Sequence, residues 1–268
     1  MQLIIRELYK IEQFISIFNI IKTNSSSVSF IVNKKEVQIQ GMDKSHICLF
    51  DIQIDKKWFN EFEYDDNKDY SFCVDSNILF NILNNTSKNQ SIVMSDIDSS
   101  NGQKATDFIY IHLINEDYKE KKGVEFDKYY KIQLNEDEYE WMDIPETEYD
   151  CDLLINSRKL VDITNQMLAF NNNIMIQCCE ENVEFSVEGT SGQMIVKIPT
   201  DDLDEFSIED GKSFSYTYSL AYLNKNCLTK NISEKINLSF STNFPLKIKY
   251  CLEDSIDICF YIAPKLQE

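Results

Sequence analysis

The sequence repeats its pattern of apolar and polar residues at an offset of about 146 over a chain of 268 residues. The superposed pairs are Phe14 and Leu160, Ile15 and Val161, Ile17 and Ile163, Ile21 and Met167, Val37 and Val183, Ile39 and Phe185, Ser45 and Ser191, and Leu49 and Ile195. A second offset of 140 pairs Leu83 with Leu223 and Asn84 with Asn224, as a longer loop in the first half would require. Because domains cluster near 100 to 150 residues, the chain is predicted to contain two copies of one fold.

Strand patterns outnumber helix patterns within each copy. Period-two alternation predicts strands at 28–30, 37–39, 47–54, 108–114, 183–185 and 247–250. Helical spacing predicts four helices, at 11–21, at 160–167 after a candidate N-cap at Ser157, at 77–84 and at 219–226. The strands do not alternate strictly with helices along the chain, which indicates an α+β fold rather than an α/β fold with a parallel sheet.

A linker separates the two copies. Residues 134–150 contain eight acidic residues, no basic residue and one proline. The chain is therefore divided into domains at 1–133 and 151–268 joined by this linker. Its Tyr139, Trp141, Met142 and Ile144 suggest that part of it lies beside an apolar groove. A linker that only connects the domains is the alternative.

The overall composition favours a soluble protein inside the cell. The chain is 43% hydrophobic and 26% charged, its longest apolar stretch is too short to cross a membrane, and its N-terminus lacks the pattern of a secretory signal. Its eight cysteines are expected to be reduced core residues. The net charge of −19 argues against nucleic acid as a partner unless basic residues gather on one face.

The sequence offers no convincing catalytic centre. A catalytic triad would have to use His46 or His112, the only two histidines. With no C-x-x-C spacing and only these two histidines, a zinc site is not expected. The six glycines form no phosphate-binding loop, and the pair Asp201 and Asp202 is typical of a solvated turn. We therefore expect no enzyme activity, no cofactor and no metal.

Two short motifs are distinctive, GMDKSHICL at 41–49 and IPETEYDC at 144–151. They resemble S-M-D-S-S-H-V-x-L and I-P-E-x-E-Y-x-C of the proliferating cell nuclear antigen (PCNA) family of DNA sliding clamps. LAYLN at 220–224, FPLKI at 244–248 and YIAPK at 261–265 resemble L-x-Y-L-N, V-P-L-x-V and Y-L-A-P-K. These motifs occur in the family's order along the whole chain.

The resemblance implies the DNA clamp fold, with two similar domains per subunit, antiparallel sheets outside and four helices lining a ring. It implies a homotrimer that encircles double-stranded DNA without reading its sequence and acts as a DNA polymerase processivity factor. By analogy with the family, subunits are expected to meet at the strands around 126–132 and 193–198. The implied contact residues are Phe126, Tyr130, Ile132, Gln193, Ile195 and Ile198.

The resemblance also implies a pocket for short peptide motifs of DNA polymerase, clamp loader, ligase and flap nuclease. The residues carried over to it are Met42, His46, Ile47, Met142, Ile144, Pro145, Tyr222, Pro245, Tyr261, Ala263 and Pro264. An exposed apolar patch normally marks a binding surface. Ordinary packing between domains is the alternative role for these residues.

The basic residues expected to face DNA lie near the helices. They are Lys10, Lys22, Lys88, Arg158, Lys159, Lys225 and Lys230. The sequence departs from the family at positions where lysine or arginine is usual, which here are Asn81, Asn84, Asp162 and Asn165. Glu180 replaces the lysine that eukaryotic clamps modify with ubiquitin. These departures predict a weaker DNA contact and suggest a large DNA virus or an early-branching eukaryote as the source.

The expected location is accordingly the nucleus, or a viral replication compartment. A diverged accessory clamp, acting as part of a heterotrimer or as a monomeric docking scaffold, is the alternative function. A protein-interaction scaffold that never touches DNA is a further alternative of a different class.

Overall fold

The computed structural model describes residues 1–64, 69–98, 102–116, 126–135, 141–227, 232–252 and 255–265. The chain divides into two compact units. Unit 1 contains 1–41, 51–141 and 253–256, and unit 2 contains 42–50, 142–252 and 257–268. Of the residues singled out in the sequence, Lys230 and Tyr139 lie outside the described residues.

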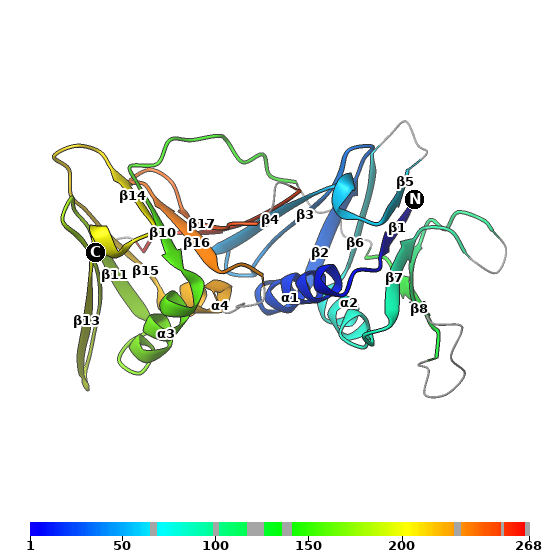
Figure 1. The fold of residues 1–268 in the computed structure, drawn as a ribbon, viewed down its shortest axis with the longest axis horizontal. Coiled ribbons are helices and arrows are strands. Elements are labelled where there is room, and N and C mark those ends of the chain that lie inside the picture. The colour runs from blue at the N-terminus through cyan, green and yellow to red at the C-terminus, as the bar shows by residue number, and fades with distance from the viewer. Residues whose placement is uncertain are drawn as a thin grey trace. The chain divides into compact units, whose positions relative to one another are not determined.

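The same order of elements occurs twice along the chain (Figure 1). The first series is β1 (Gln2–Ile5), α1 (Leu8–Asn24), β2 (Ser27–Val32), β3 (Glu36–Met42), β4 (Cys48–Asp55), the 3-10 helix η1 (Lys56–Trp58), β5 (Glu61–Glu63), β6 (Tyr70–Asp75), α2 (Ser76–Leu83), β7 (Gln90–Ser95), β8 (Phe108–Asn115) and β9 (Lys128–Gln133). The second is β10 (Cys151–Asn156), α3 (Ser157–Met167), β11 (Asn173–Cys178), β12 (Asn182–Gly189), β13 (Gly192–Pro199), η2 (Thr200–Asp202), β14 (Glu205–Ile208), β15 (Phe214–Ser219), α4 (Leu220–Cys227), β16 (Lys235–Phe240), β17 (Leu246–Tyr250) and β18 (Ile256–Ile262). The predicted duplication is therefore present in the fold.

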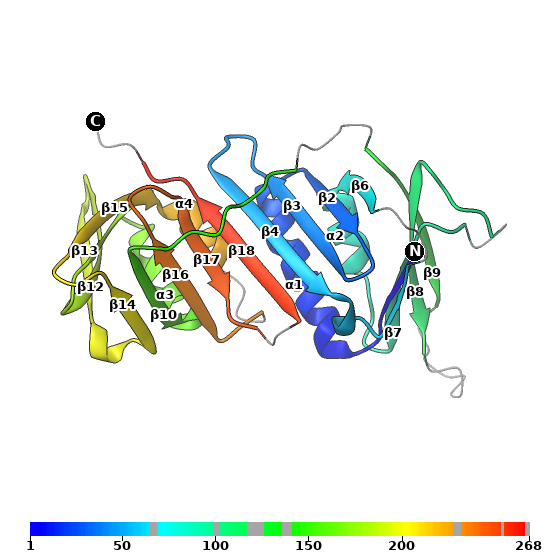
Figure 2. The same ribbon diagram turned by 90° about the horizontal axis from the view of Figure 1, so that it is seen from above.

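The strand order is also duplicated (Figure 2). In unit 1 the orders are β5-β1-β7-β8-β9 and β4-β3-β2-β6, and in unit 2 they are β14-β10-β16-β17-β18 and β13-β12-β11-β15. Strand β4 is divided, because its residues up to Phe50 belong to unit 2. The strand pairs are antiparallel, as in β7 with β8 and β12 with β13. The α+β prediction, with antiparallel sheets and four helices among the described residues, is confirmed.

The helices lie in pairs against the strands of their own unit. In Figure 1, α1 lies beside α2 and α3 lies beside α4. Helix α3 buries Leu160, Val161 and Thr164 on one face, while its other face is polar. Its N-cap is Asn156, whose side chain accepts hydrogen bonds from the amides of Arg158 and Lys159. The predicted cap Ser157 is wrong, because this residue is already helical and fully buried.

Aromatic side chains form much of the core of each unit. In unit 1, the ring centroids of Phe18 and Phe30 are 6.0 Å apart, and those of Phe30 and Phe72 are 4.6 Å apart. In unit 2, Phe240 contacts Tyr216, with centroids 5.8 Å apart. Aromatic ring contacts add to the free energy of burial, so the contact of Phe18 with Phe30 helps to hold α1 on its sheet, and the contact of Tyr216 with Phe240 joins the two sheets of unit 2.

The structure corrects the offset between the repeats. Strands β4 (Cys48–Asp55) and β13 (Gly192–Pro199) have eight residues each and begin 144 residues apart. The change from 146 occurs in the hairpin before them, where 44–47 in the first repeat correspond to only 190–191 in the second. The pairing of Leu49 with Ile195 is therefore wrong by two residues.

Helices α2 (Ser76–Leu83) and α4 (Leu220–Cys227) are also 144 residues apart, and equivalent positions of the two helices are buried. The offset of 140 is wrong by four residues. A shift of about one helical turn keeps the same face of the helix inward, so the apolar pattern alone does not detect the error.

The last strands of the repeats are equivalent at a different offset. Ile132 of β9 pairs with Ile109, the first buried residue of β8, and Ile262 of β18 pairs in the same way with Leu246 of β17. Equivalent residues of strands β9 and β18 are therefore offset by 130 in the sequence.

The cysteines are free, and six of the eight are buried as expected. Cys179 is half-buried and Cys251 is exposed, so these two are not core residues. Among the described residues, the helices are too short or too polar to span a bilayer.

Candidate functional sites

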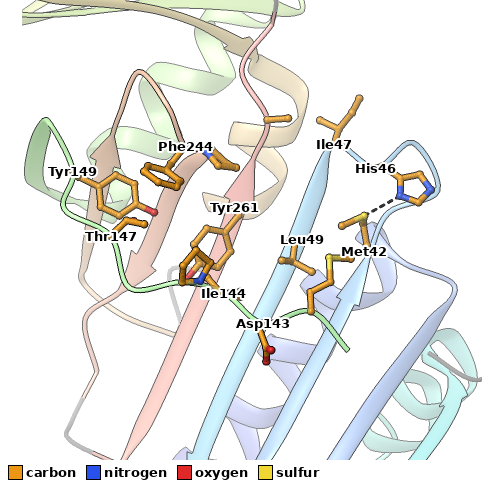
Figure 3. Close-up of a pocket in the computed structure, with 14 residues that line it drawn as sticks. Met42, His46, Ile47, Leu49, Asp143, Ile144, Thr147, Tyr149, Phe244 and Tyr261 are labelled. Carbon is orange, nitrogen blue, oxygen red and sulfur yellow. Dashed lines mark hydrogen bonds between the residues drawn. The ribbon is translucent and has the colours of Figure 1, made fainter. Parts of the chain in front are cut away.

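An apolar pocket lies within unit 2 and has a volume of about 270 Å³ (Figure 3). Its lining is mostly apolar and consists of Met42, His46, Ile47, Leu49, Met142, Asp143, Ile144, Pro145, Thr147, Tyr149, Phe244, Pro245, Tyr261 and Ala263. Ligand pockets typically measure roughly 300 to 1,000 Å³, so this one suits a few side chains rather than a large cofactor.

Four segments far apart in the sequence form the walls. Met42 ends β3, Leu49 lies on β4 and Tyr261 lies on β18, next to the residues that precede β17. In Figure 3 the 142–149 segment crosses the strands, and Ile144 lies next to Tyr261 with Leu49 nearby. Phe244 and Tyr149 lie together on the opposite side from Met42 and His46.

Nine of the eleven residues predicted for partner binding line this pocket. Tyr222 and Pro264 are not among the lining residues. The sequence comparison missed Leu49, Asp143, Thr147, Tyr149 and Phe244 as lining residues. All of these except Asp143 belong to the quoted motifs, so the sequence contains the signal, but alternation alone does not say which strand face borders a cavity.

Asp43 organises the loop that forms one wall. Its Oδ1 accepts hydrogen bonds from the amides of Ile47 (2.7 Å) and Cys48 (2.6 Å), and its Oδ2 accepts one from the amide of Ser45 (2.9 Å). Within this loop His46 has a φ of 55°, in the left-handed region that non-glycine residues rarely adopt. The hydrogen bonds to Asp43 hold the chain in that conformation and direct Ile47 into the wall.

Tyr222 lies behind this loop, on α4. Its hydroxyl donates to Oδ2 of Asp43 at 2.6 Å. Burial pushes the pKa of Asp43 up, but hydrogen bonds from Tyr222 and three backbone amides outweigh it and lower the pKa overall. Burial and the hydrogen bond to Asp43 raise the pKa of Tyr222. The carboxylate is therefore ionised and the phenol protonated near neutral pH, as this hydrogen bond requires.

The predicted DNA-facing cations differ in their surroundings. Lys10 is 3.2 Å from a carboxylate oxygen of Glu7, and Lys22 lies 3.3 Å from the ring centroid of Phe80. Lys225 lies 5.1 Å from the ring of Tyr222, and burial lowers its pKa. These three cations are half-buried and already have partners in the chain.

The remaining described cations are exposed. Lys88 lies in the turn after α2, and Arg158 and Lys159 occupy the first turn of α3. Asp162 and Asn165 on the same helix are also exposed. Cations near a helix N-terminus are electrostatically unfavourable for the helix, so Arg158 and Lys159 are well placed to attract an external anion.

The two strands predicted to meet a neighbouring subunit lie at sheet edges. Strands β9 and β13 each have a partner on one side only among the described residues. The first begins at Lys128, so Phe126 precedes it, with 85% of its surface exposed. Ile195 is 47% exposed, whereas Ile132 is buried, so its side chain points into unit 1.

The other predicted contact residues lie on the same two strands. Tyr130 and Ile198 are half-buried, and Gln193 is exposed.

Two family models together match almost the whole chain. The model of the PCNA N-terminal domain matches residues 7–139, and the model of the PCNA C-terminal domain matches residues 143–265.

Curated relatives are similar along most of their length. The chain is 24% identical to proliferating cell nuclear antigen 2 of Plasmodium falciparum (isolate 3D7), over 94% of this chain and 95% of the relative. It is 26% identical to the proliferating cell nuclear antigen of Chaetomium thermophilum, over 92% of each. It is 22% identical to a probable DNA polymerase sliding clamp of Autographa californica nuclear polyhedrosis virus, over 89% of this chain and 87% of the relative.

The fold is similar to that of a solved clamp. The crystal structure of PCNA from Thermococcus kodakaraensis superposes with a TM-score of 0.81 at 16% identity, over 98% of this chain and 99% of that one. At this identity the likeness concerns the fold alone.

Proposed function

This chain belongs to the proliferating cell nuclear antigen family of DNA sliding clamps, and we propose that it acts as a DNA polymerase processivity factor that encircles duplex DNA. The observation that carries the proposal is the match of both family domains to both copies of the duplicated fold. Such a clamp needs no bond chemistry, because a closed ring cannot leave DNA sideways and holds its partner at high effective concentration. We therefore assign no enzyme activity to it.

The ring is proposed to be a homotrimer closed through strands β9 and β13. Each is a sheet edge whose backbone groups can pair with another chain. Joining two different edges is a head-to-tail contact, which closes into a ring when the rotation between copies is right.

The repeat supports a specific register for this contact. In unit 2, the amide of Ala263 donates to the carbonyl of Ile47 at 2.9 Å, so these residues lie opposite each other. Antiparallel pairing then puts Phe50 opposite Phe260, and both are fully buried. The contact between subunits would repeat this arrangement with β13 in place of β4 and β9 in place of β18.

The offsets of 144 between β4 and β13 and of 130 between β9 and β18 predict which residues of the two subunits would lie opposite each other. Phe50 corresponds to Met194 and Phe260 to Tyr130, so Met194 of one copy would lie opposite Tyr130 of the next. The following pairs are Ile195 with Tyr129, Val196 with Lys128, Lys197 with Asp127 and Ile198 with Phe126. Apart from Val196 with Lys128, apolar or aromatic residues would meet each other, and Lys197 would meet an acid. This complementarity supports the register, since like charges opposite each other would destabilise it.

The apolar pocket is proposed to bind short peptide motifs of DNA polymerases, clamp loaders, ligases and flap nucleases. Its half-exposed Met42, Ile144 and Tyr261 offer the kind of surface on which aromatic anchors become binding hot spots. A helical turn with an aliphatic and aromatic plug fits such a groove. The acidic residues around it, such as Asp143 and Glu146, favour peptides flanked by basic residues.

DNA contact is proposed to be electrostatic and independent of sequence, through Arg158, Lys159 and Lys88. Few free cations and many asparagines on the helices favour a weak contact. Retention on DNA would then depend mostly on ring closure. The proposed location is the nucleus or a viral replication compartment.

Two measurements test this function. Light scattering across a concentration series should give three times the 31.5 kDa chain mass. Primer extension on circular DNA, with a clamp loader, should give longer products when the protein is present. A strict monomer at micromolar concentration would favour the docking scaffold instead, and unchanged product length would refute the processivity role.

A further inference from the structure

We propose that Tyr222 is a positioning residue for the partner pocket, because its hydroxyl fixes the carboxylate that shapes the pocket loop. The proposal rests on the proposed peptide-binding function of that pocket. Tyr222 does not line the pocket itself, so its effect would pass through Asp43.

The first step is the dependence of the loop on one side chain. Asp43 is 5% exposed, and its two carboxylate oxygens accept the amides of Ser45, Ile47 and Cys48. The carbonyl of Asp43 also accepts the amide of His46 at 3.0 Å. Four consecutive amides, 45–48, are thus tied to a single residue, and a small rotation of its carboxylate would shift Ile47.

The second step is what keeps that carboxylate in place. The phenol of Tyr222 donates to Oδ2 at 2.6 Å, and a charged acceptor makes this a strong hydrogen bond. Lys225 lies over the face of the tyrosine ring. One turn along α4, Asn226 donates to the sulfur of Cys48 at 3.2 Å. Helix α4 therefore anchors both the acid that organises the loop and the first residue of β4.

The duplication provides an internal comparison. The residue equivalent to Tyr222 on α2 is Ile78, which is exposed and has no hydroxyl. The residue equivalent to Asp43 is Gly189, which ends β12 at a hairpin of only two residues, 190–191. The acid comes from the first repeat and the tyrosine from the second, and neither is present at the equivalent position of the other repeat. The acid lies in the repeat whose loop is two residues longer and contributes to the apolar pocket.

The expected consequence is preorganisation. A loop held in its binding conformation spares the complex the entropy of ordering it. Removing the hydroxyl would leave the fold of α4 intact, but Oδ2 of Asp43 would then be held only by the amide of Ser45. Peptide affinity should therefore fall although no lining atom has changed.

The test is Tyr222→Phe in the full chain. A fluorescein-labelled peptide with a glutamine, an aliphatic residue and an aromatic pair is titrated against wild type and variant by anisotropy. We expect the variant to bind about tenfold more weakly, the scale of one hydrogen bond to a charged group. Amide hydrogen exchange at 45–48 should be faster in the variant and unchanged in β16 and β17.

Tyr218→Phe is the matched control. This tyrosine is also buried in unit 2, but its hydroxyl has no hydrogen-bond partner among the described residues, so its loss should change neither affinity nor exchange at 45–48. Equal affinity and equal loop exchange for Tyr222→Phe and wild type would overturn the proposal. If wild type binds no such peptide, the proposed pocket function fails, and loop exchange alone then decides the role of Tyr222.

Discussion

Oxidative crosslinking of two introduced cysteines tests the proposed ring contact at the level of single residues. Ile195→Cys and Tyr129→Cys, combined in one chain, put one thiol on each sheet edge. Both native side chains are exposed, by 47% and 63%, so an oxidant can reach the new thiols. The exposed Cys251 and the half-buried Cys179 are first replaced by serine to remove competing thiols.

The geometry sets the expected result. Ile47 and Ala263 share a backbone hydrogen bond, and Ile195 and Tyr129 correspond to the positions four residues further along the two strands. Hydrogen-bonded pairs recur every second residue in an antiparallel ladder, so Ile195 and Tyr129 would form such a pair. The Cα atoms of such a pair are about 5.5 Å apart. A disulfide spans roughly 4.4 to 6.8 Å between Cα atoms, so the two cysteines should join without moving the backbone.

The matched control moves one thiol along the same exposed face. Gln133→Cys is four residues from position 129, or about 14 Å along the strand, so it should not join Ile195→Cys. On a non-reducing gel, the first pair should give dimers and trimers and nothing larger. Crosslinking of the control pair alone would show a different register, bands beyond three chains would show an open filament, and the absence of both crosslinks would refute pairing of β9 with β13.

Three further predictions follow from the described surroundings of individual residues. The double variant Met42→Ala, Met142→Ala should bind the labelled peptide about tenfold or more weakly with the trimer intact, because both methionines line the pocket. Met175 is exposed and lies outside the pocket, so Met175→Ala should bind as wild type does. Equal affinity of the double variant and the Met175→Ala control would rule this pocket out. The double variant Arg158→Glu, Lys159→Glu should reduce both DNA affinity and the dependence of that affinity on salt. Lys22 lies against Phe80, so Lys22→Glu should change DNA affinity and its salt dependence less. A wild-type DNA affinity that does not change with salt would contradict an electrostatic contact. Burial lowers the pKa of His112 in the folded chain, so just below pH 6.5 the unfolded chain binds more protons than the folded chain. The melting temperature should therefore fall as pH drops through that window, and the fall should be smaller in His112→Gln.

The helices and most strands could be predicted from the sequence because their apolar periodicity is strong. Helix α1 and helix α3 are identified by spacing alone, and α3 is amphipathic in the structure as expected. The offset of α4 from α2 was misplaced by four residues because a shift of about one turn preserves the buried face. The cap of α3 was misplaced by one residue because both Asn156 and Ser157 are good caps, and only backbone geometry separates them.

The surroundings of the charged residues could not be predicted in the same way. Lys22 looks like a free cation in the sequence, but the aromatic ring of Phe80 on a different helix lies against it. Tyr222 belongs to a motif typical of the family, yet its partner Asp43 is 179 residues away. Such contacts depend on tertiary packing, which local pattern does not encode.

The duplication raises the question of why an apolar pocket lies beside the β3–β4 hairpin of the first repeat and not beside the equivalent β12–β13 hairpin of the second. Met42 corresponds to Glu188 at the offset of 146, and Leu49 corresponds to Gln193 at the corrected offset of 144. The groove over this part of the second repeat is lined by Glu184, Glu188 and Gln193 among other polar groups. An aromatic plug placed there would desolvate carboxylates without pairing them, which costs free energy. The two-residue longer loop and the replacement of acid and amide by methionine and leucine therefore favour a single peptide pocket in each chain.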